Sequence, residues 1–220
     1  MKHFSSILKL LTWNNQSYPI GSYSFSSGLE YAVEMDVIKS SKDLERWLKD
    51  HLEFGSLKSD AILLTETWKL KKNNKDSDII ELNNFAISLN QSREKFIENY
   101  EQGKAFIKIS KDTWKHKFVN DQLMFPLAYA SSAVQENISL ENTLLSFLHN
   151  SLGNLLGAGI KLIPLGQTEG QKIQVILNYH VEKEYKKILK QDLNNIGNCG
   201  WFSDIISMRH ENQFTRIFRT

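Results

Sequence analysis

The chain has 220 residues, with 27 lysines and arginines against 25 aspartates and glutamates, and a formal net charge of +2. A charge this close to zero argues against a nucleic-acid-binding protein and gives no sign of an acidic tail. The single cysteine, Cys199, excludes an internal disulfide and a four-cysteine zinc site, and it is typical of a reducing, cytoplasmic compartment.

The first residues, MKHFSSILKLLTW, only superficially resemble a signal peptide, because their apolar run is short and interrupted and no cleavage site follows. No apolar stretch approaches the ~20 residues of a membrane span. We therefore expect one soluble, intracellular domain over residues 1–220, with no membrane and no nucleic acid among its partners.

Helical spacing of apolar residues recurs along most of the chain. Phe4, Ile7 and Leu11 share one face of a first short helix, and Ser40 with Asp43 forms a capping-box pattern before a third. The predicted helices cover residues 4–11, a segment from 29, then 43–55, 62–70, 79–89, 92–106, 140–163 and 171–190, and a segment from 203.

The breaks between these helices come from proline and from polar runs. Pro164 is expected to stop the long apolar helix before it, and the charged run 69–78 is expected to form a solvated loop. No alternating strand pattern and no internal repeat are found. The predicted fold class is all-α, a single compact helical domain of roughly eight to ten helices.

The uncharged segment SYPIGSYSFSSGLE (residues 17–30) carries no phosphate-binding glycine motif and no G-x-S-x-G nucleophile motif. Pro19 and Gly21 predict a tight turn, with Tyr18, Tyr23 and Phe25 packing it onto the body of the protein. One of the serines is expected to cap the following helix. These serines are therefore interpreted as turn and cap residues rather than as nucleophiles.

Metal and thiol chemistry find little support. His210 and Glu211 begin like the zinc motif H-E-x-x-H, but Phe214 stands where the second ligand would be. The six histidines are scattered, without metal-ligand spacing, and are interpreted as surface or half-buried residues. Cys199 has no evident base beside it and is interpreted as a structural or weakly metal-contacting thiol.

Two segments have the composition of interfaces. Lys161 stands in an apolar run just before the proline, where its charge needs water, a carboxylate or a partner. The C-terminal sequence combines Phe214 and Phe218 with Arg216 and Arg219, and these residue types dominate binding energy at interfaces. By composition alone, the C-terminus is either a helix docked on its own domain or an anchor for another protein.

Four segments in order resemble the UreF family of urease accessory proteins: PIGSYSFSSGLE (19–30), SREKFIENYEQG (92–103), KLIPLGQ (161–167) and SMRHENQFTRIFRT (207–220). They span nearly the whole chain. Tyr18 and Thr220 depart from residues common in the family, and the chain has Lys95 to Ile97 after Arg93 and Glu94, where the family often has another arginine.

The resemblance implies an all-α protein that forms a homodimer and binds UreH (also called UreD), the GTPase UreG and apo-urease. Such a protein is a non-enzymatic chaperone subunit in GTP-dependent nickel insertion, and it modulates the GTPase. Nickel is then the cargo, GTP is bound by the partner, and no cofactor or metal of its own is implied.

Applied to this sequence, the resemblance places the partner-binding residues in its four motifs. They are Tyr23, Glu30, Lys161, Gln167, Arg209, His210, Glu211, Arg216, Phe218 and Arg219. We expect Glu30 to present an exposed carboxylate to a partner, Lys161 to act in partner regulation rather than stability, and residues 210–220 to be required for assembly.

Two other functions remain open from the sequence. One is a helical hydrolase that uses Cys199 or a serine of residues 17–30, which an unusually fast thiol reaction of Cys199 would favour. The other is an all-α scaffold unrelated to urease. Co-purification with a P-loop GTPase would favour the UreF-like function over both.

Overall fold

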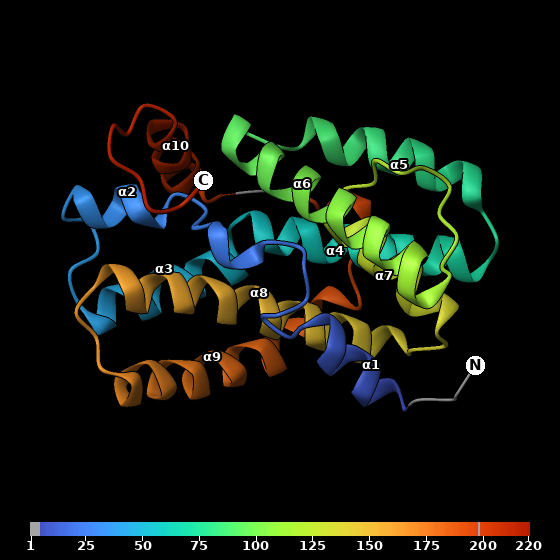
Figure 1. The fold of residues 1–220 in the computed structure, drawn as a ribbon, viewed down its shortest axis with the longest axis horizontal. Coiled ribbons are helices and arrows are strands. Elements are labelled where there is room, and N and C mark those ends of the chain that lie inside the picture. Colours follow the sequence, from blue (N-terminus) through green and yellow to red (C-terminus); the bar gives the residue numbers. More distant parts are fainter. Residues whose placement is uncertain (1–4, 198) are drawn as a thin grey trace.

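Ten α-helices make up most of the chain that the computed structural model describes, residues 5–197 and 199–220, and no strand occurs among these residues (Figure 1). The helices are α1 (Ser6–Trp13), α2 (Leu29–Glu34), α3 (Ser41–Glu53), α4 (Ser56–Lys72), α5 (Asp76–Ser88), α6 (Arg93–Ile109), α7 (Phe125–Gln135), α8 (Leu140–Leu162), α9 (Gln167–Ile188) and α10 (Trp201–His210). The predicted all-α fold is confirmed. Phe4, which was assigned to the first predicted helix, and His3, one of the six histidines, lie outside the described residues.

The helices pack in a layered arrangement around α4 and α8. Helix α4 contacts α7, α5, α3 and α8, while α8 also contacts α9, α3 and α2. Helix α6 packs on α7 and reaches α10, which in turn packs on α2. As a result, α2, α10 and the C-terminus lie together at one end of the molecule, away from α1 (Figure 1).

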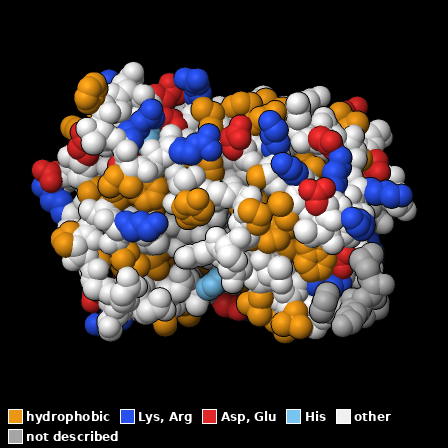
Figure 2. Space-filling view, viewed as in Figure 1, with side chains coloured by type: hydrophobic (Ala, Val, Ile, Leu, Met, Phe, Trp, Pro, Cys, Tyr) orange, Lys and Arg blue, Asp and Glu red, His pale blue; other side chains and the backbone are white. Residues whose placement is uncertain are grey.

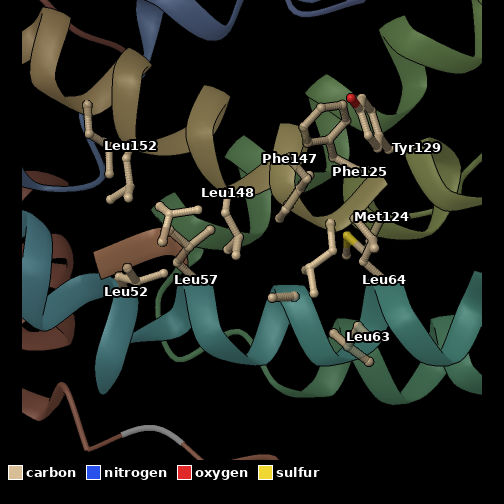
Figure 3. Close-up of a cluster of buried hydrophobic side chains, with 14 of the residues drawn as sticks. Leu52, Leu57, Leu63, Leu64, Met124, Phe125, Tyr129, Phe147, Leu148 and Leu152 are labelled. Atoms are coloured by element: carbon tan, nitrogen blue, oxygen red, sulfur yellow. The ribbon is translucent and has the colours of Figure 1, made fainter. Parts of the chain in front are cut away.

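The hydrophobic core lies between these central helices. Figure 3 shows Leu57 and Leu64 of α4 pointing toward Leu148 of α8, with Phe125 and Tyr129 of α7 beside them. All five side chains are buried. Burial of the Tyr129 hydroxyl raises its pKa to about 12, so this phenol stays neutral within the core.

Local sequence signals fix several helix ends. Ser40 and Asp43 form the predicted capping box at the start of α3. Helix α8 ends at Leu162, two residues before Pro164, as predicted. Helix α9 begins at Gln167, earlier than the expected residue 171, because Gly166 takes the extended N-cap conformation.

Two predictions of local structure are wrong. The charged run 69–78 is not a loop, because α4 continues to Lys72 and α5 begins at Asp76. Lysines in the last turn of one helix and aspartates in the first turn of the next both suit the helix dipoles. Helix α7 was not predicted, because it is buried on nearly all sides and so lacks an amphipathic period.

Among the described helices, none combines the length and the apolar character that crossing a bilayer would require.

Candidate functional site: the anchored C-terminal segment

His210, the last residue of α10, lies at the centre of a buried polar cluster. Its side chain is 0% exposed. Its Nδ1 lies 3.3 Å from Oε1 of Glu94, and its Nε2 lies 3.3 Å from Oε2 of Glu30. Glu30 is in the first turn of α2 and Glu94 in the first turn of α6. Three of the four motif segments therefore meet at one imidazole.

The Glu30 carboxylate also binds the backbone of the C-terminal segment, which we define as residues 211–220. Its Oε1 accepts from the amide of Ile217 at 2.6 Å, and its Oε2 accepts from the amide of Phe218 at 2.9 Å. Glu30 is only 5% exposed. The expectation of an exposed carboxylate is therefore wrong, because backbone donors 187 and 188 residues away enclose it.

The C-terminal segment runs back along residues 24–26 rather than forming a helix. The Arg219 amide donates to the Ser24 carbonyl at 2.8 Å. Both the amide and the hydroxyl of Ser26 donate to the Thr220 carbonyl at 2.7 Å. Phe218 and Thr220 are buried, whereas Ile217 and Arg219 point outward, an alternation typical of extended chain. The segment thus docks on its own domain, but not as the helix that was one of the two alternatives.

Cationic side chains surround this docked segment. Arg216 donates from a guanidinium nitrogen to Oε1 of Glu94 at 3.3 Å. The ammonium of Lys161 lies 5.7 Å from the ring centre of Phe218, and the guanidinium of Arg219 lies 5.6 Å from that of Phe25. Lys161 therefore joins the fourth motif segment to the other three, through an aromatic ring rather than through a carboxylate.

The remaining predicted site residues lie at or near the surface. Tyr23 is 61% exposed, on the short 3-10 turn Ser22–Ser24, and so does not pack onto the body as expected. Arg209 and Gln167 are exposed, and Glu211 is partly exposed. The α8–α9 connection, which precedes Gln167, lies at the same end of the molecule as α2 and α10 (Figure 1).

An apolar surface lies beside the anchored segment. It consists of exposed side chains of α10 and of the C-terminal segment: Trp201, Phe202, Ile205, Met208, Phe214 and Ile217. Figure 2 shows hydrophobic side chains interspersed with basic ones at this end of the molecule (upper left). Exposed apolar side chains that gather at one end of a molecule are typical of protein-binding sites. The sequence prediction missed Trp201 and Phe202, although their spacing to Ile205 and Met208 is that of one helix face.

Close packing holds α10 in place. Gly28 has a φ of +81°, and a Cβ at this position would lie 3.0 Å from backbone atoms of Ser207. The Ser207 hydroxyl lies 2.8 Å from that of Ser92, the N-cap residue of α6. Glycine is thus required before α2 both by its left-handed conformation and by the close approach of α10.

The serines of residues 17–30 serve the local fold. Ser24 donates to the Gly21 carbonyl, Ser26 to the Thr220 carbonyl, and Ser27 to the carboxylate of Glu98. The hydroxyl of Ser26 also accepts from the Glu30 amide at 3.4 Å, which agrees with the predicted capping role, although the N-cap residue itself is Gly28. These contacts match the turn and cap interpretation.

A serine, a histidine and a glutamate meet elsewhere, where α7 faces α1. His116 Nδ1 lies 3.0 Å from the Ser132 hydroxyl, and His116 Nε2 lies 3.0 Å from Oε1 of Glu136. Ser132 is completely buried, and Glu136 is already paired with Lys9 of α1 at 2.6 Å. A nucleophile must reach its substrate, so this arrangement holds α1 against α7 instead of resembling a working hydrolase site.

Burial changes the interpretation of three histidines. His51, His116 and His210 are all buried, so their assignment to surface or half-buried positions is wrong. For His51, burial and then the nearby charge of Lys95 lower the pKa from 6.5 to about 3. Burial is also the main cause of the lowered pKa of His116. Both imidazoles are neutral in the folded protein at neutral pH.

The lowered pKa of His51 makes the stability of the folded protein depend on pH. Below pH 6.5 the unfolded chain protonates His51 while the folded protein does not, so stability is lost as the pH falls from 6.5 toward 3. At pH 5 the loss from His51 should be about 2 kcal/mol. Urea unfolding at pH 7.5 and pH 5 should show a smaller pH effect in His51→Gln than in the wild type. The exposed His149→Gln variant is the control, and equal pH effects in all three proteins would contradict the prediction.

Among the described residues, no three His, Cys, Asp or Glu side chains are grouped as metal ligands. Within the buried cluster, each ring nitrogen of His210 already faces a different glutamate, so the two carboxylates do not converge on one point with the imidazole. Cys199 is exposed.

The fold and this site define an all-helical protein in which a buried polar cluster holds an extended C-terminal segment against the body, beside an exposed apolar surface. Residues 38–178 match the family model UreF. The chain belongs to the UreF family of urease accessory proteins, as the four motif segments predicted.

Individual relatives agree with this assignment over nearly the whole chain. The urease accessory protein UreF of Rhodopseudomonas palustris (strain TIE-1) is 31% identical over 223 residues, which cover 98% of this chain and 93% of that protein. The protein of the same name from Bradyrhizobium sp. (strain ORS 278) is 33% identical over 222 residues, covering 98% and 92%. Membership in an accessory-protein family indicates a chaperone-type role rather than a catalytic one.

Proposed function

We propose that this protein is a non-enzymatic subunit of the complex that inserts nickel into apo-urease, working with UreH/UreD and the GTPase UreG and modulating that GTPase. In this function nickel is the cargo, GTP is bound by UreG, and the protein works in the cytoplasm as a homodimer. Family membership supports the urease-maturation role. The observation that supports partner binding is the exposed apolar surface held beside the anchored C-terminal segment.

Within this proposal the predicted site residues divide into two groups. Tyr23 and Arg219 are both exposed. The Arg219 amide donates to the carbonyl of Ser24, the residue after Tyr23, so the backbone segments that carry these two side chains lie next to each other. We assign them, together with the exposed Arg209, to direct contact with a partner. Arginine and aromatic side chains are the types that most often dominate interface energies.

The second group acts by anchoring. Glu30, His210 and Phe218 are buried, and they fix the direction of the C-terminal segment rather than contacting a partner themselves. Lys161, which lies over the Phe218 ring, supports the same segment from α8. Gln167 and Glu211 remain partner-contact candidates through their exposure.

Point variants on the apolar surface test the proposal. Phe214 is fully exposed and Ile217 is 75% exposed, so Phe214→Ala and Ile217→Ala should leave the melting temperature unchanged. Loss of an interface anchor costs about 2 kcal/mol, or roughly 30-fold in Kd. We therefore expect the double variant to co-purify poorly with UreH/UreD or UreG and to reduce urease activation in cells.

Tyr179→Ala is the matched control, because Tyr179 is also a highly exposed aromatic residue (73%) and lies on α9, away from this surface. Undiminished co-purification of both partners with the double variant would exclude this surface as their binding site. Deletion of residues 216–220 is a poorer test, because it also removes both amides that bind Glu30.

A further inference from the structure

A small pocket of 40 Å³, partly open to solvent, lies beside the segment that carries Tyr23 and is lined by α3, α4, α6, α7 and α8. Ser22 and Ser27 of that segment line it, and polar side chains outnumber apolar ones around it. A cavity needs only about 10–15 Å³ to hold a water molecule, and apolar cavities stay empty whereas polar ones hydrate. The pocket is therefore large enough for water, and its polar side chains can form hydrogen bonds with it.

A largely buried ion pair, Lys95 and Asp60, lines this pocket and needs further hydrogen-bond partners. The ammonium of Lys95 lies 3.0 Å from Oδ2 of Asp60, and both side chains are largely buried. Asn99 donates to the other carboxylate oxygen at 3.3 Å. Burial acts to lower the pKa of Lys95, but the charges of Asp60, Glu98 and Asp204 and the hydrogen bond to Asp60 together outweigh it, so the pKa is raised. The ammonium therefore stays charged, and it has three N–H donors to satisfy.

The ion pair has space on a second side as well. Another cavity, of 190 Å³, also has Asp60 and Lys95 in its lining, together with Asn90 and Gln91 from the α5–α6 connection. A buried charge pair is costly unless further hydrogen bonds satisfy its remaining donors and acceptors. Water in these two spaces would meet that requirement.

We propose that ordered water molecules occupy the 40 Å³ cavity, complete the hydrogen bonding of Lys95, and bridge it to the segment that bears Tyr23. Ser27 is tied to α6 through Glu98 at 2.7 Å, and the water extends that connection to Ser22 and to Asn154 of α8. Bridging water is nearly as favourable as a direct hydrogen bond. This water site does not depend on the urease-maturation role.

Water-selective NMR on the full-length protein tests occupancy directly. The side-chain amide of Asn99, which lines the cavity, should show cross-relaxation with long-lived water, whereas the exposed Asn120 should show only fast-exchanging solvent. Oxygen-17 relaxation dispersion should independently count at least one long-lived water. If neither measurement detects long-lived water, the proposal is wrong.

A variant tests the bridging role. Lys95→Met with Asp60→Asn removes both charges at nearly constant size, and it should lose long-lived water and raise hydrogen exchange at the Ser26 amide at least tenfold. Lys9→Met with Glu136→Gln removes a buried pair that holds α1, and it should leave that exchange unchanged. If the first double variant keeps the wild-type exchange and water count, bridging is refuted. If the double variant Lys95→Met/Asp60→Asn does not fold, the NMR measurement on the wild type tests whether water is present. Bridging is then tested with Asn154→Leu, in which the Ser26 amide should exchange at least tenfold faster than in the wild type; an unchanged rate would refute bridging.

Discussion

Glu30→Ala should destabilise the protein by about 3 kcal/mol, because it removes one partner of a buried, charged hydrogen-bond network. The amides of Ile217 and Phe218 would lose their acceptor together, and Nε2 of His210 would lose its contact with the same carboxylate. The C-terminal segment would then detach from α2. We expect a lower urea midpoint and increased proteolytic cleavage after residue 210.

Glu81→Ala is the control for this variant, because Glu81 is an exposed glutamate in the helix α5. An exposed carboxylate contributes little to folding, so this variant should change stability by less than about 0.5 kcal/mol. Glu30→Gln should fall between the two, because an amide keeps one acceptor oxygen for the backbone donors. If Glu30→Ala and Glu81→Ala unfold at the same urea concentration, the carboxylate does not anchor the segment.

The contrast between predicted and observed Glu30 shows which features the sequence could not reveal. Residues 26–32 around it are small or apolar and contain no cation, so nothing local predicts a partner for its carboxylate, and its backbone donors lie 187 and 188 residues away. The capping box at Ser40 was predictable because all of its atoms lie within four residues. Contacts at long range in the chain depend on how the helices pack, and a periodic pattern carries no such information.

The same reasoning applies to Lys161. The sequence showed that its charge needed water, a carboxylate or a partner. In the structure Lys161 is exposed to water, and its ammonium also lies over the ring of Phe218, 57 positions further along the chain. The motif segments could therefore be singled out from the sequence, but their convergence on one anchored C-terminal segment could not.

Helix α7 shows a second kind of feature that the sequence pattern could not reveal, namely the helix itself. Its residues from Phe125 to Ala133 are all buried, so polar and apolar positions do not alternate with a helical period. The reason for its close fit to α6 lies in Gly103. A Cβ at this position would lie 2.1 Å from the carbonyl oxygen of Leu123 and 2.9 Å from the amide nitrogen of Phe125. The two backbones approach so closely that only glycine fits.

Gly103→Ala should therefore destabilise the protein by about 2 kcal/mol or more, because backbone atoms rather than a flexible side chain must move. Gly157→Ala is the matched control, since Gly157 also lies within a helix and a Cβ there would meet no atom within 4 Å. Alanine favours helix over glycine by about 1 kcal/mol, so the control should be neutral or more stable. The free energies of unfolding of the two variants, measured in urea, should thus differ by about 2–3 kcal/mol, with Gly103→Ala the less stable. Equal stability of both variants would mean that α6 and α7 can separate at no cost, and that Gly103 does not set their spacing.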